Sequence, residues 1–311
     1  MTDYTKIFNP PLVPAPPHAP LAGLPEQVGD RAAAIGYVYD EDLVLAVNVA
    51  LATGRPLLLR GRPGTGKSSV ARNVALHLKR RFYPRTVTSR TQARDLLWTV
   101  DDVSRLSDAT AKDQQVGERA DYVEPGVLWW AFAPGTAAAR RGIPDPNEGE
   151  PDAAEAVVLL DEIDKADPDV PNDLLEPLGL YWFRDIRGDV VKASTAPLII
   201  LTTNEERDLP KAFLRRCVSH TLPLPSRGKL RQIAEVRFGP DGSGLYDEVV
   251  QVLTAAEENE PEAGVDVSIA EFLDAVSAAR QLGIRPGNPH WDMLLEATTA
   301  KPVKPHPPGA S

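Results

Sequence analysis

The stretch Gly61-Arg62-Pro63-Gly64-Thr65-Gly66-Lys67-Ser68 decides the fold of this chain. It matches the pattern G-x-x-x-x-G-K-[ST], in which glycines leave consecutive backbone N–H groups free to wrap a phosphate. The pattern predicts that Lys67 reaches the terminal phosphates of a nucleotide and that the Ser68 hydroxyl ligates Mg²⁺. The apolar run Leu57–Leu59 predicts a strand before the loop, and Gly66 opens a predicted helix whose positive end faces the same phosphates.

A second acidic element follows further along the chain. The apolar run Ala156–Leu160 predicts a buried strand, and it ends in Asp161 and Glu162. Such a strand delivers its last residues to the carboxyl edge of a parallel sheet, where ligands bind. We therefore expect Asp161 to lie beside Mg²⁺, through water, and Glu162 to orient and polarise the attacking water. The alternative is a solvated acidic helix cap.

Two further polar features suit phosphoryl transfer, which needs alignment and charge stabilisation more than covalent help. The apolar run Leu198–Thr202 predicts a strand, and the amide of Asn204 after it is placed to hold the water or the γ-phosphate. Arg215 and Arg216 follow, and an arginine can neutralise transition-state charge in its own chain or in a neighbouring one. Alternatively, Asn204 is a turn residue and the arginines lie at a solvated helix end.

The chain changes character twice along its length. Between residues 31 and 225 short apolar runs alternate with helical patterns, which predicts an α/β domain with a central parallel sheet flanked by helices. Residues 226–300 show helical patterns without a convincing strand, so a small all-α lid domain is expected there. Prolines predict an N-terminal arm over residues 1–30, as a disordered leader or a docking arm, and a tail over residues 301–311.

Weaker patterns complete the expected sheet. Further strands are predicted at Arg85–Ser89 and, as an outer strand, at Val218–Leu222. The helix that opens at Gly66 is expected to continue to Arg81, because basic residues suit its negative end. Trp129-Trp130 is expected to pack a helix into the core rather than to face a partner or a pore.

Composition excludes several classes of function for these 311 residues. The formal net charge of -10 disfavours non-specific nucleic-acid binding, because an acidic surface repels phosphate backbones. No apolar run approaches the roughly 18 residues of a membrane span, and no secretory leader is recognised. Cys217, the only cysteine, is expected to be a buried thiol, which suits a reducing cytoplasm. The scattered histidines predict no metal site.

The order GRPGTGKS, VVLLDEID, LTTN and LPKAFLRR resembles that of MoxR-like AAA+ ATPases, over residues 33–290. The resemblance implies a P-loop ATPase with ATP and Mg²⁺ as cofactors, Asp161 and Glu162 as the Walker B pair, and Asn204 as sensor 1. It implies that Arg215 or Arg216 is the arginine finger that enters a neighbour's site. The nucleotide contacts that it implies are Tyr37, Val38, Gly61, Pro63, Gly64, Thr65, Gly66, Lys67, Ser68, Ser69 and, as sensor 2, Arg285.

One position departs from the family pattern. The family's sensor 2 stands beside a Pro-Ser-Thr-like helix start, whereas Arg285 stands in Ile284-Arg285-Pro286-Gly287. A solvated arginine is therefore an equal alternative for Arg285.

The resemblance also implies how such a protein acts. Members form rings, commonly hexamers, and couple ATP turnover to remodelling or assembling a protein partner, often one with a von Willebrand factor A domain. Two other functions stay open: an ATP-gated scaffold in a signalling or defence complex, and a P-loop kinase for small molecules. Intact Glu162 argues against the scaffold, and a kinase would not need Asn204 and a distant arginine pair.

Overall fold

The computed structural model describes residues 4–14, 36–111, 116–140, 143–150, 152–259 and 268–298. Most of the predicted proline-rich arm and all of the predicted tail lie outside these residues. The chain divides into two compact units. The sheet unit comprises Met1–Pro10, Asp42–Arg60 and Val74–Thr221, and the helical unit comprises Pro11–Glu41, Gly61–Asn73 and Leu222–Ser311.

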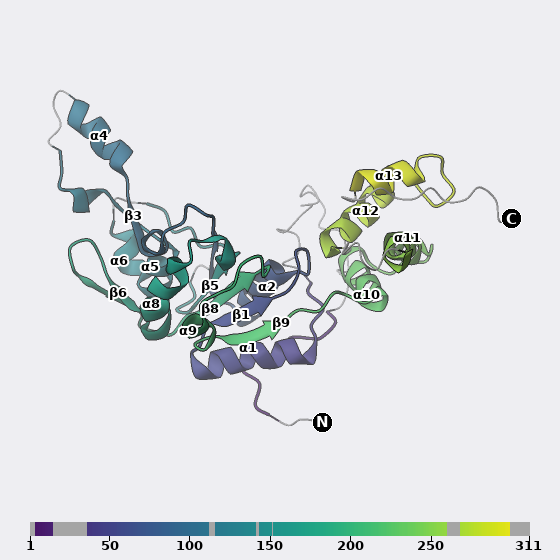
Figure 1. Ribbon diagram of the computed structural model, residues 1–311, viewed down its shortest axis with the longest axis horizontal. Helices are drawn as coiled ribbons and strands as arrows, with labels where there is room; N and C mark the ends of the chain where they lie inside the picture. Colours follow the sequence, from purple (N-terminus) through teal and green to yellow (C-terminus); the bar gives the residue numbers. More distant parts are fainter. Residues whose placement is uncertain are drawn as a thin grey trace. The chain divides into compact units, whose positions relative to one another are not determined.

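A five-stranded parallel sheet forms the centre of the sheet unit, in the order β2-β5-β8-β1-β9 (Figure 1). Its strands are β1 (Leu57–Arg60), β2 (Arg81–Thr86), β5 (Ala156–Asp161), β8 (Leu198–Thr203) and β9 (Val218–Thr221). The three central strands are nearly continuous apolar runs, as strands buried on both faces require. The predicted α/β fold with a central parallel sheet is confirmed.

Strand β2 differs from its prediction. We expected a helix reaching Arg81 and a strand at Arg85–Ser89, but α2 (Lys67–Leu78) ends earlier and β2 begins at Arg81. Lys79 adopts a left-handed φ of 52°, which ends the helix. Sequence analysis did not predict this strand because it contains Pro84, and proline has no backbone N–H to donate to a neighbouring strand. Strand β2 is an edge strand of the sheet, where such a donor is not required.

Helices cover the sheet on both faces. Helix α1 (Glu41–Thr53) is drawn next to β9 in Figure 1. On the other face α5 (Val127–Phe132) packs against β2 and β5 and buries Trp129 and Trp130, so the predicted core role of both tryptophans is confirmed. The remaining short helices of this unit are α3 (Ala93–Leu97), α6 (Pro134–Ala138), α7 (Asp169–Asp173), α8 (Leu175–Leu180), α9 (Lys211–Leu214) and the 3₁₀ turn η3 (Ile163–Lys165).

Two antiparallel ribbons are added to this core, and sequence analysis missed both. The first pairs β3 (Trp98–Val100) with β4 (Val123–Pro125), and the chain between them forms α4 (Asp102–Thr110) and the 3₁₀ turn η2 (Arg119–Tyr122). The second is a hairpin of β6 (Trp182–Arg184) and β7 (Val190–Lys192). Strands of three residues are too short to show a period of two.

The helical unit has a core of its own. Its C-terminal helices are α10 (Arg227–Phe238), α11 (Leu245–Asn259), α12 (Ile269–Leu282) and α13 (Trp291–Thr298), as Figure 1 shows. Side chains such as Tyr246, Phe272 and Leu295 are buried among these helices. The predicted helical C-terminal region is therefore confirmed. Within the described residues, no helix is long and apolar enough to cross a membrane.

Candidate functional site

The backbone of the predicted phosphate loop, between β1 and α2, requires glycine. Gly61, Gly64 and Gly66 have φ angles of +139°, +77° and +86°, which residues with a Cβ rarely adopt. A Cβ at Gly61 would approach the Leu222 carbonyl oxygen to 2.8 Å, and one at Gly64 would approach the Ser268 Cβ to 2.1 Å. Conformation and close packing therefore both select glycine in this loop.

Lys67 folds back along the loop that precedes it. Its Nζ donates to the carbonyl oxygens of Gly61, at 2.7 Å, and Arg62, at 2.8 Å. The Thr65 hydroxyl also donates to the Arg62 carbonyl, at 2.9 Å. Lys67 is buried, and a buried ammonium needs acceptors of this kind. A phosphate oxygen would be a stronger acceptor than a carbonyl, because the hydrogen bond would then join opposite charges.

A pocket of about 160 Å³ adjoins the loop within the helical unit. Loop residues line it together with Tyr37 and Val38, which were predicted to contact the nucleotide. Its other walls are mostly apolar, and they include Leu222, Pro223, Pro225, Ile233, Phe238, Ile269 and Leu273. An apolar pocket with a few polar groups is the usual receptor for a flat organic ring.

The segment that carries Tyr37 is fixed by its neighbours. The rings of Tyr37 and Tyr39 lie 4.7 Å apart, and the Tyr39 hydroxyl donates to Asn73 Oδ1 of α2 at 2.8 Å. Lys229 of α10 forms an ion pair with Asp40. Burial, with a smaller contribution from the Asp40 charge, raises the pKa of Tyr37 above its ordinary value. The ring beside the pocket is therefore uncharged at neutral pH.

The structure does not bring Arg285 to this pocket. Arg285 follows the C-terminal end of α12, and its Nη1 donates to Ser243 Oγ at 3.2 Å. The opposite end of α12 meets the phosphate loop, where the Ile269 N–H donates to the Gly64 carbonyl at 2.9 Å. The basic residues that line the pocket are Lys229 and Arg237. Arg285 is therefore not among the residues that line this pocket, and its role as sensor 2 stays a prediction.

In the sheet unit, the predicted carboxylates lie at the carboxyl end of β5. The Thr202 hydroxyl, on the neighbouring strand β8, donates to Asp161 Oδ1 and accepts from the Glu162 N–H at 2.8 Å. Glu162 has a left-handed φ of 61°. In a residue other than glycine this costs about 1–3 kcal/mol, and it persists where the surroundings enforce it. Thr202 is the buried group that fixes both acidic residues.

The carboxylate of Glu162 is held from two sides. Asn204 Nδ2 donates to its Oε1 at 3.1 Å, and Lys165 Nζ donates to its Oε2 at 2.8 Å. The hydrogen bond to Glu162 raises the pKa of Lys165, so this lysine is charged at neutral pH. Two residues predicted from separate motifs, Glu162 and Asn204, are thus in direct contact. Sequence analysis gave no role to Thr202, which lies inside the LTTN motif, or to Lys165, which directly follows VVLLDEID.

The two predicted arginines follow α9 and have exposed side chains. Arg216 Nη1 donates to the Ala212 carbonyl at 3.3 Å, within the same helical turn. Both arginines line an open pocket of the sheet unit, together with the segment Thr53–Pro56 and residues of α8. Cys217 beside them is buried, and burial raises the pKa of its thiol to about 12. The prediction of a buried thiol is confirmed.

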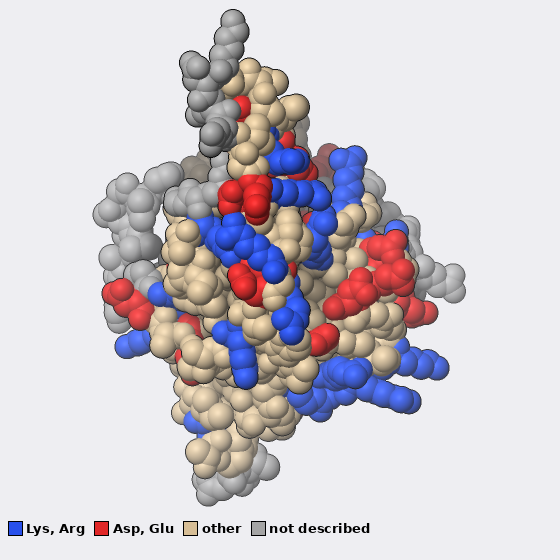
Figure 2. Space-filling view, turned by 90° about the vertical axis from the view of Figure 1, so that its left-hand side faces the viewer, with Lys and Arg blue, Asp and Glu red and all other residues tan. Residues whose placement is uncertain are grey.

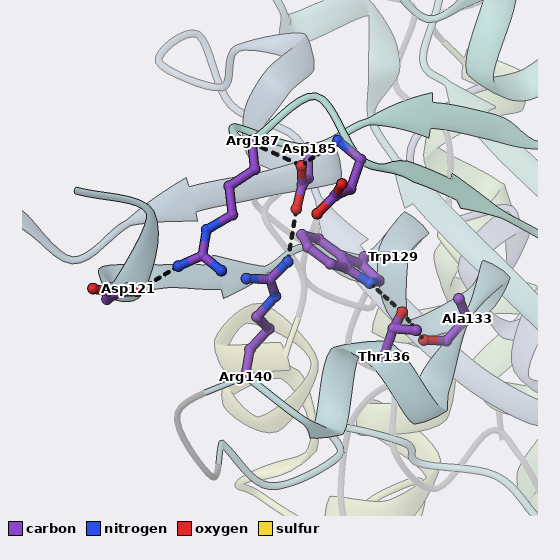
Figure 3. Close-up of polar contacts among 8 residues, drawn as sticks. Asp121, Trp129, Ala133, Thr136, Arg140, Asp185 and Arg187 are labelled. Atoms are coloured by element: carbon purple, nitrogen blue, oxygen red, sulfur yellow. Dashed lines mark hydrogen bonds and ion pairs between the residues drawn. The ribbon is translucent and has the colours of Figure 1, made fainter. Parts of the chain in front are cut away.

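A polar cluster fixes the turn of the β6–β7 hairpin (Figure 3). The buried carboxylate of Asp185 forms an ion pair with Arg140 at 2.7 Å and accepts the N–H groups of Arg187 and Asp189, each at 2.9 Å. The Arg140 guanidinium lies 5.2 Å from the centre of the Trp129 ring. These contacts attach the hairpin turn to the helices of the core.

No group of three or more His, Cys, Asp or Glu side chains that could hold a metal ion occurs among the residues that the structure describes. The hydroxyl of Ser68 and the carboxylate of Asp161 are hard oxygen donors of the kind that Mg²⁺ prefers. Each of these two groups, taken by itself, therefore has the chemistry of a Mg²⁺ ligand.

Comparisons with known proteins found one similar protein sequence and several similar solved structures. The chain is 30% identical over 179 residues to the Lon protease of Mycolicibacterium smegmatis, a match that covers 55% of this chain and 19% of that protein. Two solved structures of RuvB from Thermotoga maritima are also similar. A RuvB mutant has 14% identity and a TM-score of 0.45, and the match covers 88% of this chain and 70% of that chain. The RuvB Holliday junction branch migration motor has 15% identity and a TM-score of 0.42, with 92% and 72% covered.

A family model gives the family itself. The model for the AAA domain of the dynein-related subfamily matches residues 56–217, which run from the start of β1 past the arginine pair. That stretch is more than half of the chain and includes the phosphate loop, the β5 carboxylates and the strand before Asn204. The protein therefore belongs to the AAA domain family, dynein-related subfamily, and has the nucleotide-binding P-loop fold of AAA+ ATPases.

Proposed function

We propose that this protein hydrolyses ATP as a ring-forming, MoxR-like AAA+ ATPase and uses that turnover to remodel or assemble a protein partner. The observation that carries the proposal is the position of Glu162. Its carboxylate follows a central strand, its backbone is held in a left-handed conformation, and Asn204 and Lys165 fix its two oxygens. A carboxylate positioned in this way can orient and polarise a water molecule.

The other predicted residues take complementary roles in this proposal. Lys67 binds the terminal phosphates, and the backbone N–H groups from Gly64 to Ser69 wrap the phosphate chain. Ser68 and Asp161 hold Mg²⁺, which neutralises phosphate charge when it is bound. The apolar pocket beside Tyr37 and Val38 receives the base.

The domain division proposed from the sequence accompanies this function. Residues 31–225 would form the nucleotide-binding domain and residues 226–300 the lid, with the arm over residues 1–30 and the tail over residues 301–311. The ring, commonly a hexamer in MoxR-like proteins, would assemble from copies of this chain in the cytoplasm. A partner with a von Willebrand factor A domain is the proposed type of substrate.

The surface charge supports a protein partner over a nucleic acid. Basic and acidic side chains are interspersed over the face of the sheet unit seen in Figure 2. The chain as a whole has a net charge of -10. Binding to a phosphate backbone relies on neutralisation of the phosphates by lysine and arginine. Neither the mixed charges on this face nor the negative net charge of the chain favours such neutralisation.

The test of the proposal is Glu162→Gln. The amide keeps the shape of the side chain and loses the charge that polarises water, so ATP should still bind while kcat falls by about 10²–10⁴-fold. Phosphate release and calorimetric titration with ATP measure the two quantities separately. A loss in kcat below about tenfold would contradict the role of Glu162.

The same experiment separates the rival functions. A wild-type protein that releases ADP and phosphate in water without a second substrate is an ATPase rather than a kinase. A protein that binds ATP but shows no turnover, with or without the arginine pair, would instead be the ATP-gated scaffold. Molecular mass in solution with and without ATP tests the proposed ring, and Glu162→Gln, held in the ATP state, is the form with which to isolate the partner.

A further inference from the structure

Arg55, in the segment between α1 and β1, contacts the backbone of the arginine pair through its side chain. Its Nη2 donates to the carbonyl oxygens of Arg215, at 2.8 Å, and Cys217, at 2.7 Å. Its Nε donates to the carbonyl oxygen of Arg216 at 3.2 Å. One guanidinium thus binds three consecutive backbone carbonyls, and these belong to the two predicted finger residues and the residue after them.

We infer that Arg55 is a positioning residue for Arg215 and Arg216, an inference that rests on the ATPase function proposed above. Nothing in the arrangement requires Arg55 to touch nucleotide. It acts on the backbone from which the two exposed arginine side chains extend. The direction in which those side chains leave the protein surface depends on that backbone.

The chemistry of arginine suits this task. The three carbonyls lie at the end of α9, where the last carbonyl groups of a helix lack partners within the helix. A guanidinium is always charged, and it presents several donors in one rigid plane. Lysine has one nitrogen on a flexible stem, so it cannot reproduce a planar contact with three carbonyls.

Arg55 is itself held in place by its neighbours in the chain. Gly54 has a left-handed φ of +64°, and its carbonyl accepts a hydrogen bond from the Tyr181 hydroxyl at the end of α8. The Pro56 carbonyl accepts the Val218 N–H at 2.8 Å, where β9 begins to pair with β1. The support is therefore fixed on both sides of Arg55, and it connects the central strand β1 to the arginine pair.

Cys217 provides a readout of this contact that does not depend on ATP turnover. It is the only cysteine of the chain, it is 5% exposed, and its carbonyl is one of the three that Arg55 binds. Loss of Arg55 should open the segment and increase the rate at which a maleimide labels Cys217. The direction of the change in labelling rate distinguishes two effects. Arg55 lowers the pKa of the Cys217 thiol, so if the segment did not open, removal of Arg55 would leave less thiolate and slow the labelling.

The experiment compares Arg55→Ala and Arg55→Lys with Arg184→Ala. Arg184 is the matched control, because it is an exposed arginine that donates to a backbone carbonyl, that of Gly188 at 2.9 Å, in the β6–β7 hairpin. Arg55→Ala should label at least about tenfold faster than wild type, with Arg55→Lys in between and Arg184→Ala unchanged. The kcat of Arg55→Ala for ATP hydrolysis should fall by about 10–100-fold, because small misplacements of a catalytic group have effects of this size. The affinity of Arg55→Ala for ATP should not change.

Two further results distinguish positioning from a merely structural role. Added to a variant in which both Arg215 and Arg216 are alanine, Arg55→Ala should cause no further loss of kcat, because nothing is left to position. Unchanged labelling and kcat in Arg55→Ala, or equal and additive losses in both backgrounds, would overturn the inference. If Arg55→Ala does not fold, Arg55→Lys and Arg55→Gln decide by the same two readouts. A wild-type protein without ATPase activity would overturn the proposed function instead, and the labelling rates would still show whether Arg55 holds the segment.

Discussion

At the scale of single residues, Lys67 is the side chain proposed to bind the terminal phosphates of ATP. Its buried ammonium is held by two loop carbonyls at 2.7 and 2.8 Å, so it is already directed at the loop that should wrap the phosphates. Truncating one partner of a buried charge pair costs 2–5 kcal/mol or more, so Lys67→Ala should weaken ATP binding by at least about 30-fold. Calorimetric titration with ATP and Mg²⁺ measures this. Lys79→Ala, which removes an exposed lysine just after the same helix, should bind ATP as wild type does; equal affinity in both variants would contradict the site.

Residues that are proposed to act through local motifs could be identified from the sequence, whereas residues whose contacts cross the sheet could not. Lys67 and Glu162 stand in short patterns that carry their chemistry with them. Arg55 contacts the carbonyl of a residue 160 positions away, and backbone carbonyls leave no signal in a sequence. Thr202 could have been noticed, because it precedes Asn204 in the same run, but its contact with Asp161 depends on the register of β5 and β8.

At the scale of elements, hydrophobic runs predicted the three central strands because both of their faces are buried. Edge strand β2 was not predicted within its bounds, because it contains Pro84 and mixes apolar with polar residues. The β6–β7 hairpin was not predicted either, because polar contacts rather than an apolar pattern hold its turn. Chief among these is the ion pair of Asp185 with Arg140, in which the carboxylate is fully buried and the arginine side chain is 21% exposed.

Asp185→Ala tests how much this polar cluster contributes to the hairpin. The substitution leaves the Arg140 charge without its partner and two backbone N–H groups without their acceptor, so the free energy of unfolding should fall by about 3 kcal/mol. Asp189→Ala is the matched control in the same turn: its side chain is exposed, and its backbone carbonyl keeps the Asp185 N–H. The control should stay within about 0.5 kcal/mol of wild type. Urea unfolding followed by tryptophan fluorescence gives both values, and equal stability of the two variants would show that the ion pair contributes nothing net.

At the scale of the whole molecule, the proposed ring makes activity depend on assembly. The side chains of Arg215 and Arg216 are exposed, and Arg55 fixes the backbone from which they extend. An arginine that is rigidly supported and directed to the surface is suited to enter a neighbouring subunit's site. Arginines supplied in this way are worth about 10³–10⁵ in rate in characterised nucleotide switches. Turnover should therefore require contact between subunits, and specific activity should rise with protein concentration until the ring is complete.

Mixing two inactive variants tests whether the arginines act in trans. One variant has both arginines replaced by alanine and keeps Lys67; the other is Lys67→Ala and keeps both arginines. Each alone should be nearly inactive, since one lacks the finger and the other lacks the phosphate ligand. In mixed rings some interfaces combine an intact phosphate loop with an intact arginine pair, so part of the wild-type activity should return, and it should reach a maximum at an intermediate mixing ratio. If mixed oligomers form, as mass measurement can show, and no activity returns at any ratio, then the arginines act in their own chain or serve only the structure.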